Sequence, residues 1–490
     1  MDYQNLLEGL SVEGSIPAGV ATMITQDNRR IEPGGVFVCI RGRTSDGHDF
    51  ARAALEAGAG LIISEHKLGL KREVVAEDTR HAYAFLCQRF FGNPAEKLTL
   101  IAVTGTNGKT TVSSILKQVL QALGRPCGLI GSIHSEIGQM TIPAKYTTPE
   151  PWDLAALMHR MVVAGCTHVV MEASSQALDQ GRLLGLRFAL SIFTNLSRDH
   201  LDWHGSMDEY YAAKKSLFAQ SDAMLTNMDD LYGGHLLEEA AAPQKCSYSF
   251  KSDAADFVAH SVELQAGAVR FGFLGEGMLY PLTFPMPGEY SVYNALAAGG
   301  AAIMLGLPAG DVVEALGKVK SVPGRCEVLH AGRFTVIRDF AHTGDGLEKL
   351  LGALRPFVKG RLVVLYGCAG ERDASKRIEM SESAVRYGDV LFLTSDNPRG
   401  EPPDKIIREA LPPLEQAGKP YNTFIDREDA LRRALDTLGD GDVLTLCGKG
   451  HEDYQVLAGR TVFLDEKQFV EEWLESCSAE IDGQQAAVLH

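Results

Sequence analysis

Short apolar runs alternate with amphipathic stretches along most of this chain. The apolar run at residues 98–104 is typical of a strand buried on both faces of a parallel sheet. A glycine-rich turn follows, and residues 112–124 then carry apolar positions at helical spacing and end at a Gly, which predicts a helix. The same apolar pattern predicts further buried strands at residues 167–174, 190–197, 334–342, 361–370, 389–397 and 442–450. Repeated strand and helix units predict an α/β fold with parallel sheets.

Two segments rich in turn residues divide this pattern into three parts. Residues 90–100 contain Gly-Asn-Pro and residues 318–328 contain Val-Pro-Gly, which are linker signals. We therefore predict three domains: a small N-terminal α/β domain at 1–96, a central parallel-sheet domain of P-loop type at 97–322, and a C-terminal Rossmann-like domain at 323–490. The length of 490 residues fits about three domains of ~150 residues each.

Composition and charge exclude several classes of protein. Apolar residues make up 45% and charged residues 22%, as in a soluble globular protein. The net charge of -16, with no basic stripe, argues against nucleic-acid binding. We expect no signal peptide and no membrane span, because the chain starts without a basic or long apolar segment and no 18 apolar residues run together. The nine cysteines show no paired spacing, which favours a reducing cytoplasm.

The strongest chemical signal is the turn after the first strand of the central segment. Its backbone amides and the following helix N-terminus suit a phosphate, which Lys109 would neutralise, while Thr110 would reach Mg²⁺. Val103 stands where the usual P-loop pattern has its first Gly, so a plain Gly turn with a chance Lys remains the weaker alternative. The predicted phosphate-binding residues are Gly105, Thr106, Asn107, Gly108, Lys109, Thr110 and Thr111.

Other polar residues of the central segment leave two interpretations open. Glu172 ends a predicted strand and suits either Mg²⁺ or the cap region of the next helix. His200, with Asp199 and Asp202, suits a metal site, although a lone His is more often a capping or surface residue. Lys214 and Lys215 begin a predicted helical turn beside aromatic residues, and spacing alone favours a solvated basic face.

Charged side chains follow several predicted strands of the third segment. Because ligands bind at the carboxyl ends of parallel strands, these clusters predict a binding face for a small anionic molecule. The residues are Asp339, His342, Arg372, Lys376, Arg377, Lys449, His451 and Glu452. No Ser-His-Asp arrangement and no zinc spacing is suggested.

Eleven motifs together carry a family resemblance, in one order along nearly the whole chain. They are GTNGKTT, KYTTPEP, MEASSQAL, NLSRDHLDWHG, YYAAKKSLF, GEYSVYNALAA, VPGRCEV, FAHTGD, GCAGERD, DNPR and GKGHEDYQ. The chain resembles the Mur ligase family, and within it the members that extend UDP-N-acetylmuramoyl-L-alanyl-D-glutamate. The resemblance implies an ATP- and Mg²⁺-dependent ligase that adds meso-diaminopimelate through an acyl phosphate in peptidoglycan synthesis. It also implies small-molecule substrates and a monomer.

The resemblance assigns roles residue by residue. Glu172, His200 and Thr110 would hold Mg²⁺, Lys214 would bind a second Mg²⁺ as a carbamate, and these residues with Lys109 form the expected catalytic set. The expected ATP contacts beyond the P-loop are Asn294, Arg325, Asp339 and His342. The expected contacts to the UDP-substrate are Asn28, Arg43, Thr44, Ser45, Thr147, Thr148, Ser174, Gln180 and Arg182. The expected contacts to the amino acid are Arg372, Asp396, Asn397, Pro398, Arg399, Gly448 and Glu452.

Arg399 is the residue from which the added amino acid is predicted. A guanidinium binds a carboxylate in two places at once, and meso-diaminopimelate differs from lysine by one distal carboxylate. A lysine-adding enzyme, a paralogue acting on a related carboxylate and a catalytically silent binding protein are the alternatives, and a GTPase switch is less favoured. The intact Lys109, Glu172, His200 and Lys214 argue against silence. The chain departs from the family pattern at Asn28, Tyr146, Gln176 and Gly344, which affects mainly the uridine end.

Overall fold

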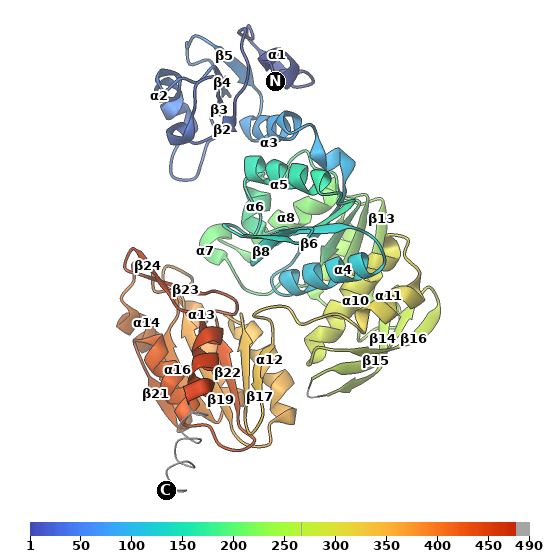
Figure 1. The fold of residues 1–490 in the computed structure, drawn as a ribbon, viewed down its shortest axis with the longest axis vertical. Helices are drawn as coiled ribbons and strands as arrows, with labels where there is room; N and C mark the ends of the chain where they lie inside the picture. The colour runs from blue at the N-terminus through green and yellow to red at the C-terminus, as the bar shows by residue number, and fades with distance from the viewer. Residues whose placement is uncertain (266, 477–490) are drawn as a thin grey trace, which may run out of the picture.

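The chain is built around three separate sheets that follow one another along the molecule. The computed structural model describes residues 1–265 and 267–476. Figure 1 shows the N-terminal part at one end, the central part in the middle and the C-terminal part at the other end. The three sheets have the orders β1-β5-β4-β3-β2, β16-β15-β14-β13-β12-β11-β6-β10-β7-β8-β9 and β17-β18-β22-β19-β20-β21. The predicted three-domain α/β fold is confirmed, while the exact domain boundaries stay predictions.

The N-terminal part is a five-stranded sheet in which β2 to β5 run parallel and β1 is antiparallel to β5. Its strands are β1 (Val12–Glu13), β2 (Ile24–Thr25), β3 (Val36–Val38), β4 (Leu61–Ser64) and β5 (Glu73–Ala76). Its helices are α1 (Tyr3–Leu7), η1 (Asn28–Arg30), η2 (Gly47–Phe50), α2 (Ala51–Glu56), α3 (Thr79–Phe90) and η3 (Pro94–Lys97). Helix α3 packs against α5 (Pro151–Val163) of the central part. This contact joins the two parts (Figure 1).

The central part has parallel strands in its middle and antiparallel strands at both edges. Its strands are β6 (Thr99–Thr104), β7 (Cys127–Ile130), β8 (His134–Ile137), β9 (Met140–Pro143), β10 (His168–Glu172), β11 (Leu190–Phe193), β12 (Ala223–Asn227), β13 (Gln244–Ser249), β14 (Phe257–Leu264), β15 (Val269–Gly275) and β16 (Met278–Phe284). Its helices are α4 (Lys109–Ala122), α5 (Pro151–Val163), α6 (Ser175–Asp179), α7 (Leu201–His204), α8 (Met207–Lys215), η4 (Ser216–Gln220), α9 (Leu231–Glu239), α10 (Glu289–Met304) and α11 (Ala309–Leu316).

The C-terminal part is a six-stranded sheet that is parallel except for β17. Its strands are β17 (Glu327–Ala331), β18 (Thr335–Asp339), β19 (Leu362–Cys368), β20 (Val390–Ser395), β21 (Tyr421–Thr423) and β22 (Val443–Cys447), and a separate hairpin is formed by β23 (Tyr454–Leu457) and β24 (Arg460–Phe463). Its helices are α12 (Gly344–Leu354), η5 (Arg355–Phe357), α13 (Ser375–Tyr387), α14 (Pro403–Ala410), α15 (Pro412–Ala417) and α16 (Arg427–Asp436), and residues 466–476 are also helical.

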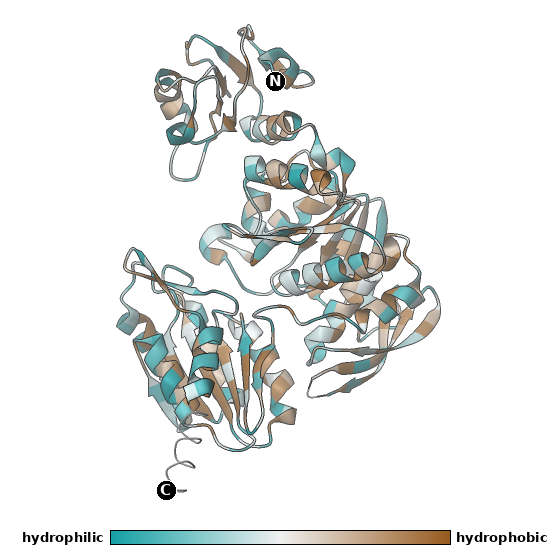
Figure 2. Cartoon of the chain, viewed as in Figure 1, coloured by the Kyte–Doolittle hydropathy of each residue, from teal (hydrophilic) through white to brown (hydrophobic). Residues whose placement is uncertain are grey.

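Apolar side chains cover both faces of the two larger sheets. In the central part, one core cluster joins the sheet to α4, α10 and α11, and a second joins the opposite face to α5 and neighbouring helices. The C-terminal sheet likewise packs against α12 to α15 on one face and α16 on the other. Figure 2 shows the strands as predominantly apolar and the outward helix faces as polar. Because both faces are covered, polar ligands can reach these sheets mainly at the strand ends.

Three predictions about the elements need correction or completion. The third segment begins one strand earlier than predicted, because β17 lies partly inside the predicted linker at 318–328. Lys214 and Lys215 end α8 instead of beginning a helical turn. The antiparallel strands β14 to β16 were not predicted, since their exposed sides interrupt the continuous apolar pattern. No helix in the described ranges is long and apolar enough to cross a membrane. The sequence of the tail at residues 477–490 predicts a frayed end, and this tail lies outside the described residues.

Candidate active site

The turn predicted to bind phosphate lies between β6, in the middle of the sheet, and α4. Gly105 has φ +142, and a Cβ there would lie 2.0 Å from the Thr194 hydroxyl oxygen. Gly108 has φ +88 and precedes the first residue of α4. Both positions therefore require glycine, for space at Gly105 and for backbone conformation at both. The predicted strand, turn and helix are all present, and Thr110 and Thr111 lie in the first turn of α4.

Two lysine side chains donate to the carbonyl oxygens of this turn. Lys109 Nζ lies 2.9 Å from the Gly105 oxygen and 2.8 Å from the Thr106 oxygen. Lys214 Nζ lies 2.8 Å from the same Gly105 oxygen, and the Lys214 residue is 1% exposed. Burial lowers the pKa of Lys109, and burial together with the nearby Lys109 charge lowers that of Lys214 well below its usual value. The solvated basic face that spacing alone favoured is therefore wrong for Lys214, whereas Lys215 is partly exposed and pairs with Glu239.

Glu172 lies at the end of β10, beside the first turn of α4. Its carboxylate accepts hydrogen bonds from Thr110 Oγ1 at 2.9 Å and from the backbone and side chain of Ser132 at 2.8 and 2.9 Å. Thr110 Oγ1 in turn accepts from Arg325 Nη2 at 3.2 Å, across the boundary to the C-terminal part. A carboxylate and a hydroxyl next to this turn are hard oxygen donors, which Mg²⁺ prefers. The segment after Glu172 does cap α6, through Ser174, as the alternative expected, while the Glu172 carboxylate itself bonds Thr110 and Ser132.

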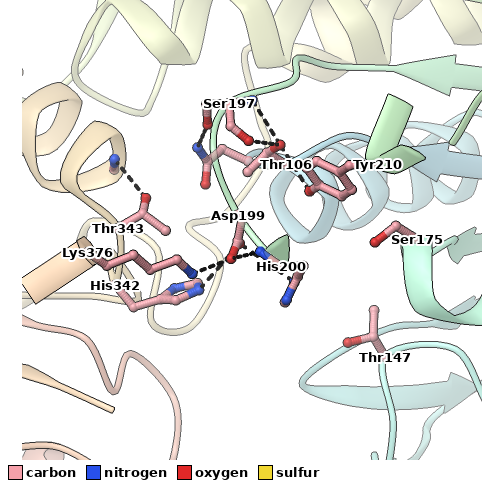
Figure 3. Close-up of polar contacts among 12 residues, drawn as sticks. Thr106, Thr147, Ser175, Ser197, Asp199, His200, Tyr210, His342, Thr343 and Lys376 are labelled. Carbon is pink, nitrogen blue, oxygen red and sulfur yellow. Dashed lines mark hydrogen bonds and ion pairs between the residues drawn. The ribbon is translucent and has the colours of Figure 1, made fainter. Parts of the chain in front are cut away.

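The turn at residues 195–200 joins the P-loop to the C-terminal part. Asp199, 4% exposed, contacts the ammonium of Lys376 and lies 3.6 Å from His200 Nε2 and 4.0 Å from His342 Nε2. Figure 3 shows these side chains converging from both sides of the boundary. Burial would raise the pKa of Asp199, but the nearby histidine side chains and the Lys376 ammonium outweigh it and lower the pKa. Burial lowers the pKa of His200 to about 3, which keeps its imidazole neutral.

The P-loop itself also contacts the C-terminal part. Asn107 Nδ2 donates to Asp345 Oδ2 at 2.9 Å, and the Ser197 hydroxyl donates to the same oxygen at 3.2 Å. Asp345 lies in the first turn of α12, whose cap is Thr343. Arg325 stacks over the Phe340 ring at 4.5 Å, and its charge opposes the burial that raises the pKa of Asp339. Residues of both parts that are predicted to bind the nucleotide are therefore held together.

One cavity of about 1510 Å³ brings together most of the predicted site residues. It reaches from the P-loop, past the Glu172 region, to the strand ends of the C-terminal sheet. Its lining includes Thr106, Asn107, Gly108, Lys109, Thr110, Thr111, Thr147, Thr148, Glu172, Ser174, Gln180, Arg182, His200, Lys214, Asn294, Arg325, Asp339, His342, Arg372, Asp396, Asn397, Arg399, Gly448 and Glu452. The predicted residues outside this lining are Asn28, Arg43, Thr44, Ser45, Gly105, Asp202, Lys215, Pro398 and Lys449.

The turns after β20 and β22 form the far end of the cavity. Asn397 Nδ2 donates to Glu452 Oε2 at 2.9 Å, and Lys449 Nζ lies 3.2 Å from the same oxygen. Arg399 donates from Nη1 to the Gly370 oxygen at 2.7 Å, and burial and the nearby Arg372 charge lower its pKa. No carboxylate pairs with Arg399 within salt-bridge distance among the described residues. This end therefore offers both a cation and an anion to a ligand.

Beneath these two turns lies a fully buried guanidinium. Arg427 donates to the backbone oxygens of Ser395 at 3.2 Å and Cys447 at 2.9 Å, which end β20 and β22. Its Nε lies 2.7 Å from Glu466, and both side chains are 0% exposed. One side chain thus fixes the starting points of both turns.

At the other end of the cavity, only some of the residues predicted to contact the UDP-substrate belong to the cavity lining. Arg182 donates to the Thr148 oxygen at 2.8 Å and lies over the Tyr146 ring at 5.0 Å, within the cavity lining. Arg43 instead lies over the Trp203 ring at 4.5 Å and donates to the Trp203 oxygen at 2.8 Å. Arg43 therefore joins the N-terminal part to α7 in this structure, and Thr44 and Ser45 beside it are exposed.

Some features of the site were not predicted from the sequence. Asp199 was expected to share a metal site with Asp202, but Asp202 is exposed and no group of three His, Cys, Asp or Glu side chains suited to a metal occurs in the described part of the chain. Arg377 pairs with Glu401 at 2.7 Å and with Glu409, so it does not contribute a free charge. The contact of Lys376 with Asp199 joins residues 177 positions apart, for which local patterns provide no signal.

The fold and the site are those expected of a three-domain amino-acid ligase, and comparisons with known proteins agree. The chain matches the Mur ligase middle domain over residues 103–302, the Mur ligase glutamate ligase domain over 324–450 and the Mur ligase family catalytic domain over 20–84. The chain belongs to the Mur ligase family, which confirms the resemblance carried by the motifs.

Two curated relatives and one solved structure within that family carry the same name. The chain is 38% identical to UDP-N-acetylmuramoyl-L-alanyl-D-glutamate--2,6-diaminopimelate ligase of Clostridium perfringens, over 97% of this chain and 100% of that protein. It is 40% identical to the enzyme of that name from Geobacillus thermodenitrificans, over 91% and 93%. A solved structure of a ligase with the same name superposes with a TM-score of 0.69 at 29% identity, covering 94% of this chain and 95% of that one.

Proposed function

We propose that the chain joins meso-diaminopimelate to UDP-N-acetylmuramoyl-L-alanyl-D-glutamate and hydrolyses ATP to ADP and phosphate. The observation that carries the proposal is a single cavity with a P-loop at one end and Arg399 beside Glu452 at the other. The name of the curated relatives supports the same substrate pair. We further propose a monomeric cytoplasmic enzyme of cell-wall precursor synthesis.

The proposed reaction has two steps. A substrate carboxylate oxygen attacks the γ-phosphorus of ATP, and ADP leaves, which forms an acyl phosphate. The amine of the amino acid then attacks the acyl carbon, and phosphate leaves while the amine loses a proton. The P-loop amides and Lys109 would hold the phosphates, and Arg325 would bring charge from the C-terminal part. The contacts of Asp199 and Asn107 across the boundary support this arrangement, because they hold the two reacting ends in one cavity.

The residues present fit a magnesium ion. Thr110 and Glu172 supply hard oxygen donors at the phosphate end, and neutral His200 supplies a nitrogen donor nearby. When bound, Mg²⁺ would offset the negative charge of the phosphate oxygens. The chain's own contribution is to hold Glu172 in place through Ser132 and Thr110.

Lys214 would act as a carbamate. A neutral amine reacts with carbon dioxide, whereas an ammonium does not, and burial beside Lys109 favours the neutral form of Lys214. The carbamate is an anion, so it would relieve the repulsion between the two buried amines and add a ligand for a second Mg²⁺. This proposal accounts for a lysine with 1% exposure whose amine donates to a backbone oxygen and lies over the Tyr210 ring, with no carboxylate in salt-bridge distance among the described residues.

Arg399 would select the amino acid through its distal carboxylate. Lysine lacks that carboxylate and would leave the half-buried guanidinium unpaired, which costs binding energy. Glu452 and Asn397 would meet the distal ammonium. A lysine-adding enzyme has no use for this cation, which is why the diaminopimelate assignment is favoured here.

The experiment is ADP release by the purified full chain with ATP, the UDP-dipeptide substrate and one amino acid at a time. We expect turnover with meso-diaminopimelate and little with L-lysine. Turnover with lysine alone would assign the lysine-adding activity, and no turnover with any diaminopimelate isomer would refute the proposal. A substrate carboxylate labelled with ¹⁸O tests the intermediate, because the acyl phosphate transfers one labelled oxygen to inorganic phosphate; unlabelled phosphate would exclude it.

A further inference from the structure

The hairpin β23–β24 is a separate two-stranded sheet beside the far end of the cavity. It does not join the six-stranded sheet, and in Figure 1 it lies at the edge of the C-terminal part. A two-stranded hairpin is at best marginally stable by itself. Its order in this chain therefore depends on contacts with neighbouring segments.

Most of those contacts are made with the turn at residues 396–399. The buried side chain of Gln455 donates from Nε2 to the Asp396 backbone oxygen. The Val456 amide donates to Asn397 Oδ1 at 2.9 Å, and its carbonyl accepts from the Arg399 amide at 3.0 Å. The Ala458 amide donates to the Arg399 oxygen at 2.8 Å. Every residue of the turn except Pro398 is thus bonded to the hairpin.

The backbone of Arg399 needs this support. Arg399 has φ +54, and Ala458, which faces it, has φ +43. A residue with a side chain is disfavoured in this region and remains there only when its surroundings hold it. Because the φ angle sets the direction of the side chain, the hairpin also fixes where the guanidinium points.

We propose that Gln455 is a positioning residue that sets amino-acid selectivity by holding the 396–399 turn. The proposal rests on the proposed function, since it concerns the same amino-acid site. Gln455 is 6% exposed, so water cannot readily replace its hydrogen bond to the turn. Gln455 does not line the cavity, whereas Asn397 and Arg399 do, so its effect on the ligand passes through the turn.

The test compares wild type with Gln455→Met, which keeps the side-chain volume and removes the donor. Thr461→Ala, on the exposed side of β24 in the same hairpin, is the matched control. We expect Gln455→Met to raise the KM for meso-diaminopimelate about tenfold, the effect of one buried hydrogen bond. The KM for ATP and kcat should change less than twofold, and the preference over lysine should fall. Thr461→Ala should behave as wild type.

Hydrogen exchange provides a readout that does not need turnover. In Gln455→Met, the amide of Arg399 should exchange faster while amides of α4 stay unchanged. If wild type fails to use diaminopimelate but the turn still loosens in the variant, the proposed function fails and the positioning role of Gln455 stands. The inference would be overturned by unchanged exchange at residues 396–399 or by an unchanged KM for diaminopimelate. It would also be overturned if the KM for ATP rose equally and the melting temperature fell.

Discussion

Replacing Asp199 by Asn should weaken the contact that holds the central and C-terminal parts together. Asp199 is 4% exposed, and Lys376, its partner across the boundary, is 8% exposed. Asn keeps the size and one hydrogen-bond acceptor but removes the negative charge. The ammonium of Lys376 then remains buried between the two parts without a counter-charge, near the imidazole of His342.

The size of the effect follows from the burial of the pair. Removing one partner of a buried ion pair costs about 3–5 kcal/mol. Because Asn keeps a hydrogen-bond acceptor at this position, we expect the lower value, about 3 kcal/mol. If the parts separate, both groups regain water, so the cost falls on the closed arrangement. At about 1.4 kcal/mol for each factor of ten, the closed population relative to the open one should fall about a hundredfold.

A double-mutant cycle checks this reasoning. We expect Asp199→Asn, Lys376→Met and the double variant to lower kcat/KM for ATP by similar factors, with small-angle scattering showing a larger radius of gyration in each. Losses that multiply in the double variant would show that the two residues act independently, and the argument would fail. Arg198→Ala is the control, because the Arg198 side chain is half exposed and its two ion pairs across the same boundary are long, at 3.5 Å, so each is worth below about 1 kcal/mol.

Three further predictions concern single sites. Arg399→Lys should raise the KM for meso-diaminopimelate about tenfold or more and leave the KM for ATP unchanged, because one ammonium cannot bind a carboxylate in two places. Steady-state kinetics test this, and an equal shift in both KM values would contradict it. Lys214→Ala should abolish turnover, and added bicarbonate should not restore it. Wild type depleted of carbon dioxide should instead recover when bicarbonate is added. Full activity of the variant would exclude a role for the carbamate. The hydrogen bond from His134, with a further one from Lys117, lowers the pKa of Glu136 to about 2 despite its burial. That stability is present above pH ~4.5 and is lost as the pH falls toward 2, so Glu136→Gln should unfold more readily than wild type in urea at pH 7, with the difference disappearing near pH 2; a constant difference would refute it.

The sequence predicted the elements whose environment is simple. The central strands were predicted because both faces are covered, so they read as unbroken apolar runs, and β6 with α4 is the clearest case. The strands β14 to β16 were missed because one side is exposed, which breaks the run. Strand β17 was missed because a turn signal directly precedes it.

The residues of the candidate site also differ in how well the sequence predicted them. Residues at strand ends, such as Glu172 and Asp396, were recognisable because position in a motif also determines position in space. The role of Asp199 was misjudged because its partner Lys376 lies on another domain, and only folding brings the two together. Lys214 was hard to interpret for a related reason, since spacing along α8 says nothing about the P-loop carbonyl that its amine meets.

The buried guanidinium beneath the amino-acid turns bears on how specificity can change. Besides its ion pair with Glu466, Arg427 contacts the two turns only through the backbone oxygens of Ser395 and Cys447, and every residue type supplies such an oxygen. The residues displayed on the two turns can therefore be exchanged without altering the anchor below them. New amino-acid preferences could thus arise on this scaffold by substitution in the turns alone, with the stability of the sheet preserved.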